Sequence, residues 1–110
     1  MEELKSKIKV EYGFDKTFIT FNDESILEEH QIKKLEDAII TVIKKNKDGE
    51  LILNFCNVQF MSSSLLGLLV KIHKKLCELN SHLKLININP TIYKVFKITQ
   101  LTKVFDISQM

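Results

Sequence analysis

The sequence contains no arginine, so its 16 basic residues are all lysines, and 14 acidic residues leave a formal net charge of +2. Arginine makes bidentate contacts to phosphates and base edges, whereas lysine offers only a point charge. Dedicated nucleic-acid binders also carry a basic patch and an isoelectric point above about 9. The missing arginines and the even charge balance therefore argue against a nucleic-acid partner.

Long apolar runs are also missing. No stretch approaches the ~18–20 apolar residues that span a bilayer. The charged N-terminus, Met1–Lys9, lacks the apolar run of a signal peptide. The two cysteines, Cys56 and Cys77, do not make a disulfide framework. We therefore expect a cytoplasmic protein in a reducing compartment, without a membrane partner.

One proline and three glycines are few for 110 residues, of which 45% are hydrophobic. This length predicts one domain, residues 1–110. Alternating residues predict an opening β-hairpin, near-continuous apolar runs predict two buried strands, and helical spacing predicts three helices. The predicted strands are Ile8–Tyr12, Thr17–Phe21, Leu51–Phe55 and Leu83–Ile88; the predicted helices are 28–45, the serine triplet to about Asn80, and one capped by Asn89-Pro90.

This element order predicts an α/β fold with a mixed β-sheet. An N-terminal β-hairpin is followed by a βαβα alternation, which implies parallel strands and right-handed crossovers. The last apolar segment, from Leu101 to Ile107, is short, and its pattern does not decide whether the chain ends in a further strand.

The junction before the second helix is the most informative segment. Three serines, Ser62–Ser64, open an amphipathic helix whose apolar stripe is centred on Leu65, Ile72 and Leu79. Serines commonly cap helices, because the first N–H groups lack partners. A phosphate on one of them would instead bring about −1.5 to −2 charges to the positive end of the helix. The triplet is thus either a cap or a switch.

Helical geometry places the triplet relative to that stripe. At about 100° per residue, Ser64 falls at the edge of the stripe and is expected to be accessible. Leu66 and Val70 fall on its opposite flank. They either belong to a partner surface or are covered by another helix.

The same stretch resembles the signature of STAS domains, named for sulfate transporters and anti-sigma-factor antagonists. In that family a buried strand leads to Phe/Tyr-Ile/Met-Asp-Ser-Ser/Thr-Gly-Leu-Gly; here the corresponding residues are Phe60 to Gly67. The segments 88–99 and 101–107 are similar to the family's third helix and its usual ending. The resemblance covers nearly the whole chain and implies helices packed largely on one side of a mixed sheet.

In stand-alone bacterial members, the resemblance implies an anti-sigma-factor antagonist. Such a protein binds an anti-sigma factor, which is a serine kinase, and a serine phosphatase is a further partner. The phosphoacceptor carried over by position is Ser64, with Ser63 and Ser62 as alternatives. The implied partner-binding residues are Ser62, Ser63, Ser64, Leu65, Leu66, Gly67 and Val70, in a protein that is a monomer or weak dimer.

Two positions depart from the family motif. Ser62 stands at the aspartate position, and Leu65 stands at the first glycine. The first departure removes a charge beside the phosphoacceptor, and the second adds a side chain where a partner approaches. The alternative function is therefore a STAS scaffold or sensor module that binds a protein or small ligand without phosphorylation.

Enzymatic and metal chemistry find little support in the sequence. No glycine precedes the serine triplet, so the nucleophile elbow of serine hydrolases is absent, and there is no glycine-rich nucleotide loop. His73 and Cys77 share one helix face and would form half of a metal site. Cys56 is expected to be a buried core residue. We therefore predict no catalytic residue, cofactor or metal.

Overall fold

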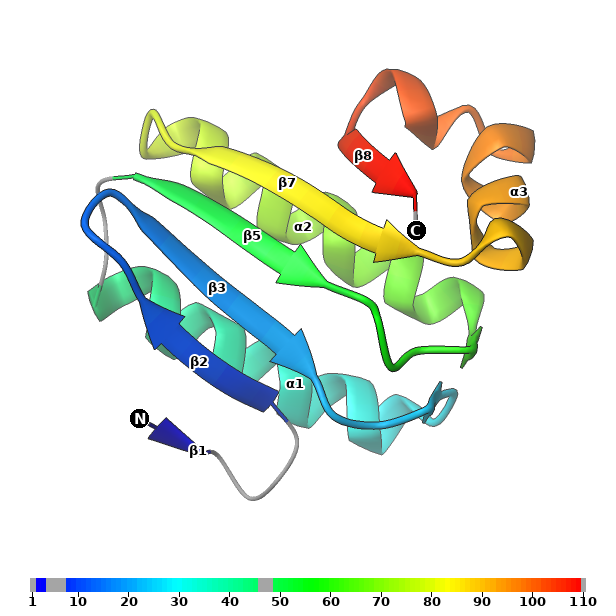
Figure 1. Ribbon diagram of the computed structural model, residues 1–110, viewed down its shortest axis with the longest axis horizontal. Coiled ribbons are helices and arrows are strands. Elements are labelled where there is room, and N and C mark those ends of the chain that lie inside the picture. Colours follow the sequence, from blue (N-terminus) through cyan, green and yellow to red (C-terminus); the bar gives the residue numbers. More distant parts are fainter. Residues whose placement is uncertain (1, 4–7, 46–48, 110) are drawn as a thin grey trace.

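The computed structural model describes residues 2–3, 8–45 and 49–109, and the main sheet crosses most of the molecule (Figure 1). In these residues the sheet has six strands in the order β1-β2-β3-β5-β7-β8. They are β1 (Glu2–Glu3), β2 (Ile8–Tyr12), β3 (Lys16–Phe21), β5 (Glu50–Asn54), β7 (His82–Ile88) and β8 (Asp106–Gln109).

The pairing within the sheet is mixed, as the element order predicts. Strands β2 and β3 form the antiparallel hairpin, with Val10 opposite Ile19. The β3–β5, β5–β7 and β7–β8 pairs are parallel. The predicted α/β fold, with an N-terminal hairpin and a βαβα alternation, is confirmed. The final apolar segment, whose structure the sequence did not decide, leads into the last strand, β8.

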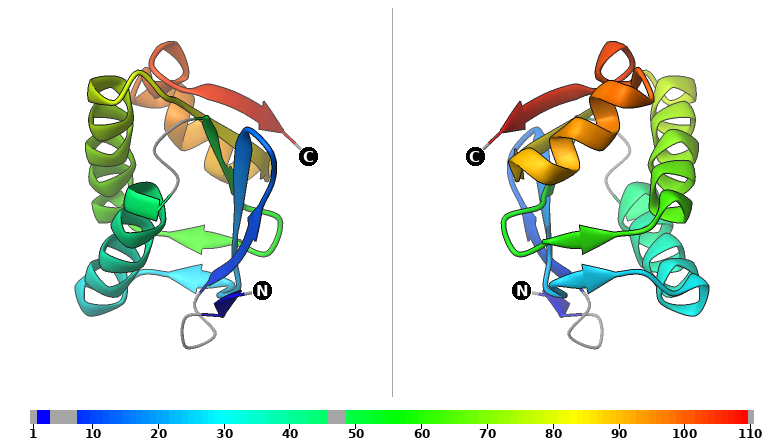
Figure 2. Two further views of the ribbon diagram at one scale, coloured as in Figure 1. Left: turned by 90° about the vertical axis from the view of Figure 1, so that its left-hand side faces the viewer. Right: turned by 90° about the vertical axis from the view of Figure 1, so that its right-hand side faces the viewer.

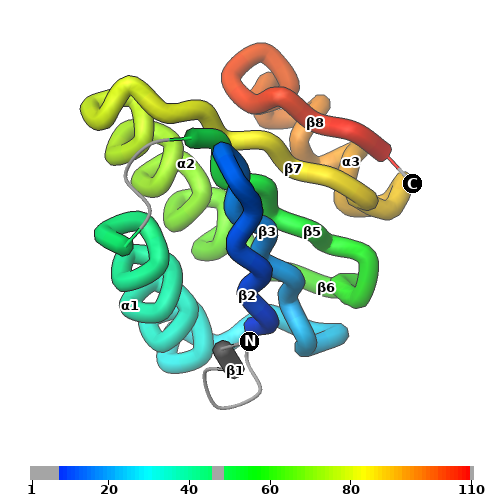
Figure 3. The backbone as a smooth tube through the Cα atoms, turned by 60° about the vertical axis from the view of Figure 1, so that its left-hand side comes forward, coloured from blue at the N-terminus to red at the C-terminus, as the bar shows by residue number. Residues whose placement is uncertain are grey.

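Two long helices, α1 (Glu29–Lys45) and α2 (Ser63–Glu78), cover one face of this sheet side by side (Figures 2 and 3). Helix α3 (Pro90–Ile98) and the short 3-10 helix η1 (Leu101–Lys103) connect β7 to β8. No helix in the described ranges is both long and apolar enough to cross a membrane.

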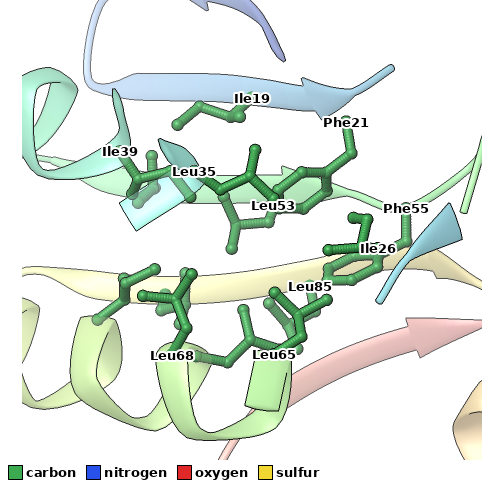
Figure 4. Close-up of a cluster of buried hydrophobic side chains, with 14 of the residues drawn as sticks. Ile19, Phe21, Ile26, Leu35, Ile39, Leu53, Phe55, Leu65, Leu68 and Leu85 are labelled. Atoms are coloured by element: carbon green, nitrogen blue, oxygen red, sulfur yellow. The ribbon is translucent and has the colours of Figure 1, made fainter. Parts of the chain in front are cut away.

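The core lies between the two long helices and the sheet. Figure 4 shows Leu35 and Ile39 of α1 and Leu65 and Leu68 of α2 pointing toward the strands. These residues repeat at helical spacing, so each helix buries one stripe and exposes its charged face. The sequence pattern therefore predicted the buried faces of both helices correctly.

The structure also contains a second, two-stranded sheet that the sequence pattern did not predict. Strands β4 (Ser25–Ile26) and β6 (Phe60–Met61) pair in parallel just before α1 and α2. Two residues are too few to show any periodicity, so only the folded chain shows this pairing. It ties the starts of the two long helices together.

Candidate functional site

The serine triplet forms the start of α2, on the same side of the molecule as α1 (Figure 3). Ser62 is the extended N-cap residue, and Ser63 and Ser64 are the first two residues of the helix. Ser63 and Ser64 are exposed, while Ser62 is half-buried. The structure therefore confirms the expectation that Ser64 is accessible to solvent.

Ser62 caps the helix by position but not through its hydroxyl. Its side chain makes no cap hydrogen bond, and its Oγ is buried without a hydrogen-bond partner among the described residues. The N–H of Leu65 instead donates to the carbonyl oxygen of Ser62 at 3.1 Å. This geometry leaves the other two hydroxyls as the chemically available ones.

The backbone before the triplet is fixed by the second sheet. The N–H groups of Gln59 and Phe60 both donate to the carbonyl oxygen of Glu24, at 2.8 and 3.1 Å. The N–H of Ser62 donates to the carbonyl oxygen of Ile26 at 3.0 Å. The segment that enters α1 thus positions the segment that enters α2.

Asparagine side chains hold the loop between β5 and β6 from its other side. Asn54 Oδ1 accepts from the Cys56 N–H at 3.1 Å and from Asn87 Nδ2 at 2.9 Å. Asn57 Nδ2 donates to the Phe21 carbonyl oxygen at 3.0 Å. The loop is therefore anchored to three strands before it reaches the serines.

Gln31 anchors the start of α1 in a similar way. Its Nε2 donates to Asp23 Oδ2 at 2.9 Å and to the Ser25 carbonyl oxygen at 2.7 Å, while its Oε1 accepts from the Leu27 N–H at 3.0 Å. A glutamine in the first turn that bonds back to preceding backbone satisfies helix-start N–H groups. It fixes the start of α1 against the segment that precedes it.

A surface hollow of about 380 Å³ adjoins Ser64 between the two helices. Its remaining lining comes from α1: Glu29, Ile32, Lys33 and Glu36. Lys71 of α2 donates to Glu36 Oε2 at 2.8 Å. That hydrogen bond, with the charges of Lys71 and Lys33, holds the pKa of Glu36 below its ordinary value despite some desolvation.

The structure corrects part of the expected partner surface. Leu65 is fully buried in the core and Leu66 is 7% exposed, so neither side chain offers contact area at the surface. Leu65 is buried at the centre of the apolar stripe of α2, as its helical spacing predicts, and the buried stripe also includes its neighbour Leu66. Gly67 is exposed, and Val70 is half-buried against the core.

His73 and Cys77 share a face of α2 and lie close together, as their spacing predicts. Cys77 Sγ lies 3.7 Å from His73 Nε2, and the His73 ring packs edge-on against Phe105. The expectation that Cys56 is buried is wrong: both cysteines are exposed and free. Cys56 follows the last residue of β5 by two positions, where the chain leaves the sheet.

Sequence reasoning missed the α1 side of the hollow. Glu29, Lys33 and Glu36 are far from Ser64 in the sequence, and their distance from it depends on how the two helices pack. Gln31 carried a usable signal, since a glutamine in the first helical turn is typical of a capping box.

Solved structures with the same fold include two that are described as anti-sigma-factor antagonists. An anti-sigma-factor antagonist (STAS) domain protein from Planctomyces limnophilus is 19% identical, with 94% of this chain and 90% of that chain covered and a TM-score of 0.84. An anti-sigma factor antagonist from Mycobacterium paratuberculosis is 20% identical, with 94% and 85% covered and a TM-score of 0.80.

The Bacillus cell fate determinant SpoIIAA, solved in its phosphorylated form, is 24% identical, with 91% of this chain and 89% of that chain covered and a TM-score of 0.69. At these identities the likenesses show the shared fold. The family model for the STAS domain matches residues 11–110. The chain therefore belongs to the STAS domain family.

Proposed function

We propose that this protein is a cytoplasmic anti-sigma-factor antagonist, a non-catalytic switch that sequesters an anti-sigma factor with serine kinase activity. Two structures of the same fold are described as anti-sigma-factor antagonists, and a third is SpoIIAA in its phosphorylated form. The kinase transfers the γ-phosphoryl group of ATP to a serine oxygen and releases ADP and the hydroxyl proton. A serine phosphatase resets the switch.

The observation that carries this proposal is the position of Ser64, which is exposed in the first turn of α2 and borders the hollow. A phosphate there would receive support from the helix N-terminus. It would also lie in a hollow whose lining has two carboxylates, Glu29 and Glu36, and one lysine, Lys33. Phosphorylation would make this surface strongly anionic and weaken a kinase complex through repulsion and desolvation.

The burial of the serines supports Ser64 and Ser63 over Ser62. A kinase must reach the hydroxyl oxygen, and Ser62 Oγ is buried whereas the other two residues are exposed. The Ser62 departure from the motif then removes a carboxylate next to the acceptor without adding a competing site. The partner surface would include the exposed part of the half-buried Val70 and the polar face of α1. Its other members would be Ser63, Ser64 and Gly67.

The test combines capture of the partner with mass spectrometry. The chain is returned to its native cells in tagged form, recovered with its partners, and cleaved after lysine. All three serines fall in one peptide, residues 48–71, because no lysine or arginine lies between Lys47 and Lys71. We expect co-recovery of a serine kinase and a single phosphate on Ser64.

Matched variants decide between acceptors. Ser64→Ala should abolish phosphate incorporation by the recovered kinase, while Ser63→Ala should keep it. Undiminished incorporation into Ser64→Ala would remove Ser64 from the role. Recovery of a partner without kinase activity, and of an unmodified peptide, would contradict the switch.

The alternative function, a scaffold or sensor without phosphorylation, is favoured by a separate observation. Exposed Leu27, Phe60 and Val95 surround an apolar hollow of about 320 Å³ between the second sheet and α3. Exposed large apolar residues of this kind are typical of interaction surfaces. Charged substitutions of Phe60 that abolish partner recovery, with Ser64→Ala retaining it, would support the alternative.

A further inference from the structure

Three side chains of metal-ligand type converge at one end of the parallel strands. Glu50 begins β5, His82 begins β7 and Asp106 begins β8, and these strands lie side by side (Figure 1). His82 Nε2 lies 3.2 Å from Asp106 Oδ2 and 3.7 Å from Glu50 Oε2. All three ligand atoms lie within 4.8 Å of one another.

Strand register accounts for this convergence. Glu50 and His82 are direct partners in the β5–β7 ladder, so their side chains point to the same face. Leu51 and Leu83, one residue further along each strand, are buried in the core under the helices. Glu50 and His82 therefore point to the opposite face of the sheet. Asp106 joins them from the neighbouring edge strand, where it pairs with Lys84.

The spacing fits a small tetrahedral ion. Zinc binds imidazole nitrogen and carboxylate oxygen at about 2.0–2.2 Å, which places neighbouring ligand atoms about 3.4 Å apart. The two distances from His82 Nε2 bracket that value. We propose that Glu50, His82 and Asp106 form a surface site for a zinc-class divalent cation, with water in the remaining coordination position.

The ligand set also selects the type of ion. One imidazole and two carboxylates suit zinc and neighbouring transition ions, whereas magnesium prefers six oxygen ligands in octahedral geometry. Lys16 is the ladder partner of Glu50, and Lys84 is the partner of Asp106. These two cations offset the carboxylate charge, so the site should bind zinc reversibly rather than as a permanent structural ion.

Binding there would join three strands from outside the core. The site lies where the chain enters β5, whereas the serine triplet follows the opposite end of that strand. The two ends of this five-residue strand are about 13 Å apart. The inference is therefore independent of the proposed phosphorylation switch.

The direct test is calorimetric titration of zinc chloride into untagged, chelator-treated protein at pH 7.5 in a buffer that does not bind zinc. We expect one ion per chain, and a thermal unfolding midpoint that rises with zinc concentration. His82→Gln should weaken binding at least tenfold and remove the zinc-dependent rise. Asp106→Asn should have the same two effects, and it serves as the second test if His82→Gln proves unstable without metal. Magnesium chloride should give no saturable binding at the same concentrations.

Matched controls separate this site from the other candidate ligands. His30→Gln removes an exposed histidine of α1, and Cys77→Ser removes the thiol beside His73. Both should bind zinc like the unaltered chain. Loss of binding in Cys77→Ser, unchanged binding in His82→Gln and Asp106→Asn, or no saturable binding by the unaltered chain would each overturn the site. In the last case the cluster would be an ion pair only.

Discussion

Lys71 and Glu36 join the two helices beside the serine triplet, with Lys71 Nζ 2.8 Å from Glu36 Oε2. Glu36 also lines the hollow next to Ser64. The pair therefore couples the packing of α1 on α2 to the charge of the candidate site.

Lys71→Gln should reduce stability by a few tenths of a kcal/mol at neutral pH, because the lysine side chain is 62% exposed and exposed pairs contribute little. The pKa of Glu36 is lowered in the folded chain, so this contribution is present above its ordinary value of 4.5 and is lost as the pH falls through the lowered value. Urea unfolding of both chains at several pH values checks this. The difference should narrow below pH 4.5, and Lys74→Gln on the same helix should show no such pH dependence.

The two helix N-caps should respond differently to alanine. Asn89 Oδ1 accepts from the Ile92 N–H at 2.8 Å, and its Nδ2 donates to the Val58 carbonyl oxygen at 3.2 Å. Asn89→Ala should therefore cost about 1–2 kcal/mol. Ser62→Ala removes a buried hydroxyl that has no partner among the described residues, so it should be neutral or slightly stabilising. Chemical denaturation measures both, and an equal loss in the two variants would contradict the assignment.

Two glycines offer a second matched pair. Gly49 has a φ of 116°, and a Cβ there would collide with the Asp15 carbonyl oxygen, so Gly49→Ala should cost about 1–3 kcal/mol. Gly67 lies inside α2 with open space around it, so Gly67→Ala should stabilise by about 0.5–1 kcal/mol. Thermal unfolding distinguishes these outcomes. If Gly67→Ala also weakens partner binding, that loss cannot come from unfolding.

A phosphate mimic at Ser64 should alter binding without harming the fold. Ser64→Glu places a negative charge in the first turn of α2, where the helix dipole contributes about 0.3–1 kcal/mol in its favour. Its unfolding midpoint should stay level or rise, while affinity for the recovered kinase falls at least tenfold. Adding Glu29→Gln, which removes one carboxylate of the hollow, should restore part of that affinity. Unchanged affinity in Ser64→Glu would argue against charge as the switching agent.

The sequence pattern predicted the long elements because each one buries a periodic face. The stripe centred on Leu65, Ile72 and Leu79 and the run Leu51–Phe55 are local signals. Most of their apolar residues are in the core, and Leu79 is only partly buried. The Asn89 cap and Pro90 likewise marked the start of α3 correctly, since capping depends on neighbouring residues.

The candidate sites depend on tertiary placement and were only partly predictable. Ser64 was located through its motif, but Glu29 and Glu36 came beside it through helix packing. Glu50, His82 and Asp106 are far apart in the chain, and strand register alone brings them together. The motif placed Leu65 and Leu66 among the partner-binding residues because it indicates proximity to a partner, whereas the helical stripe correctly indicated that Leu65 is buried.

The strand order β1-β2-β3-β5-β7-β8 follows the order of the chain. In the six-stranded sheet each strand pairs with the strand that precedes it in the chain order given above. No strand of this sheet is therefore inserted between two strands that come earlier in the chain. During synthesis, β5 can dock on a finished hairpin as soon as α1 has emerged, and β7 on β5 after α2. Each edge is exposed only until the next βα unit arrives, which shortens the time in which nascent chains could pair with one another.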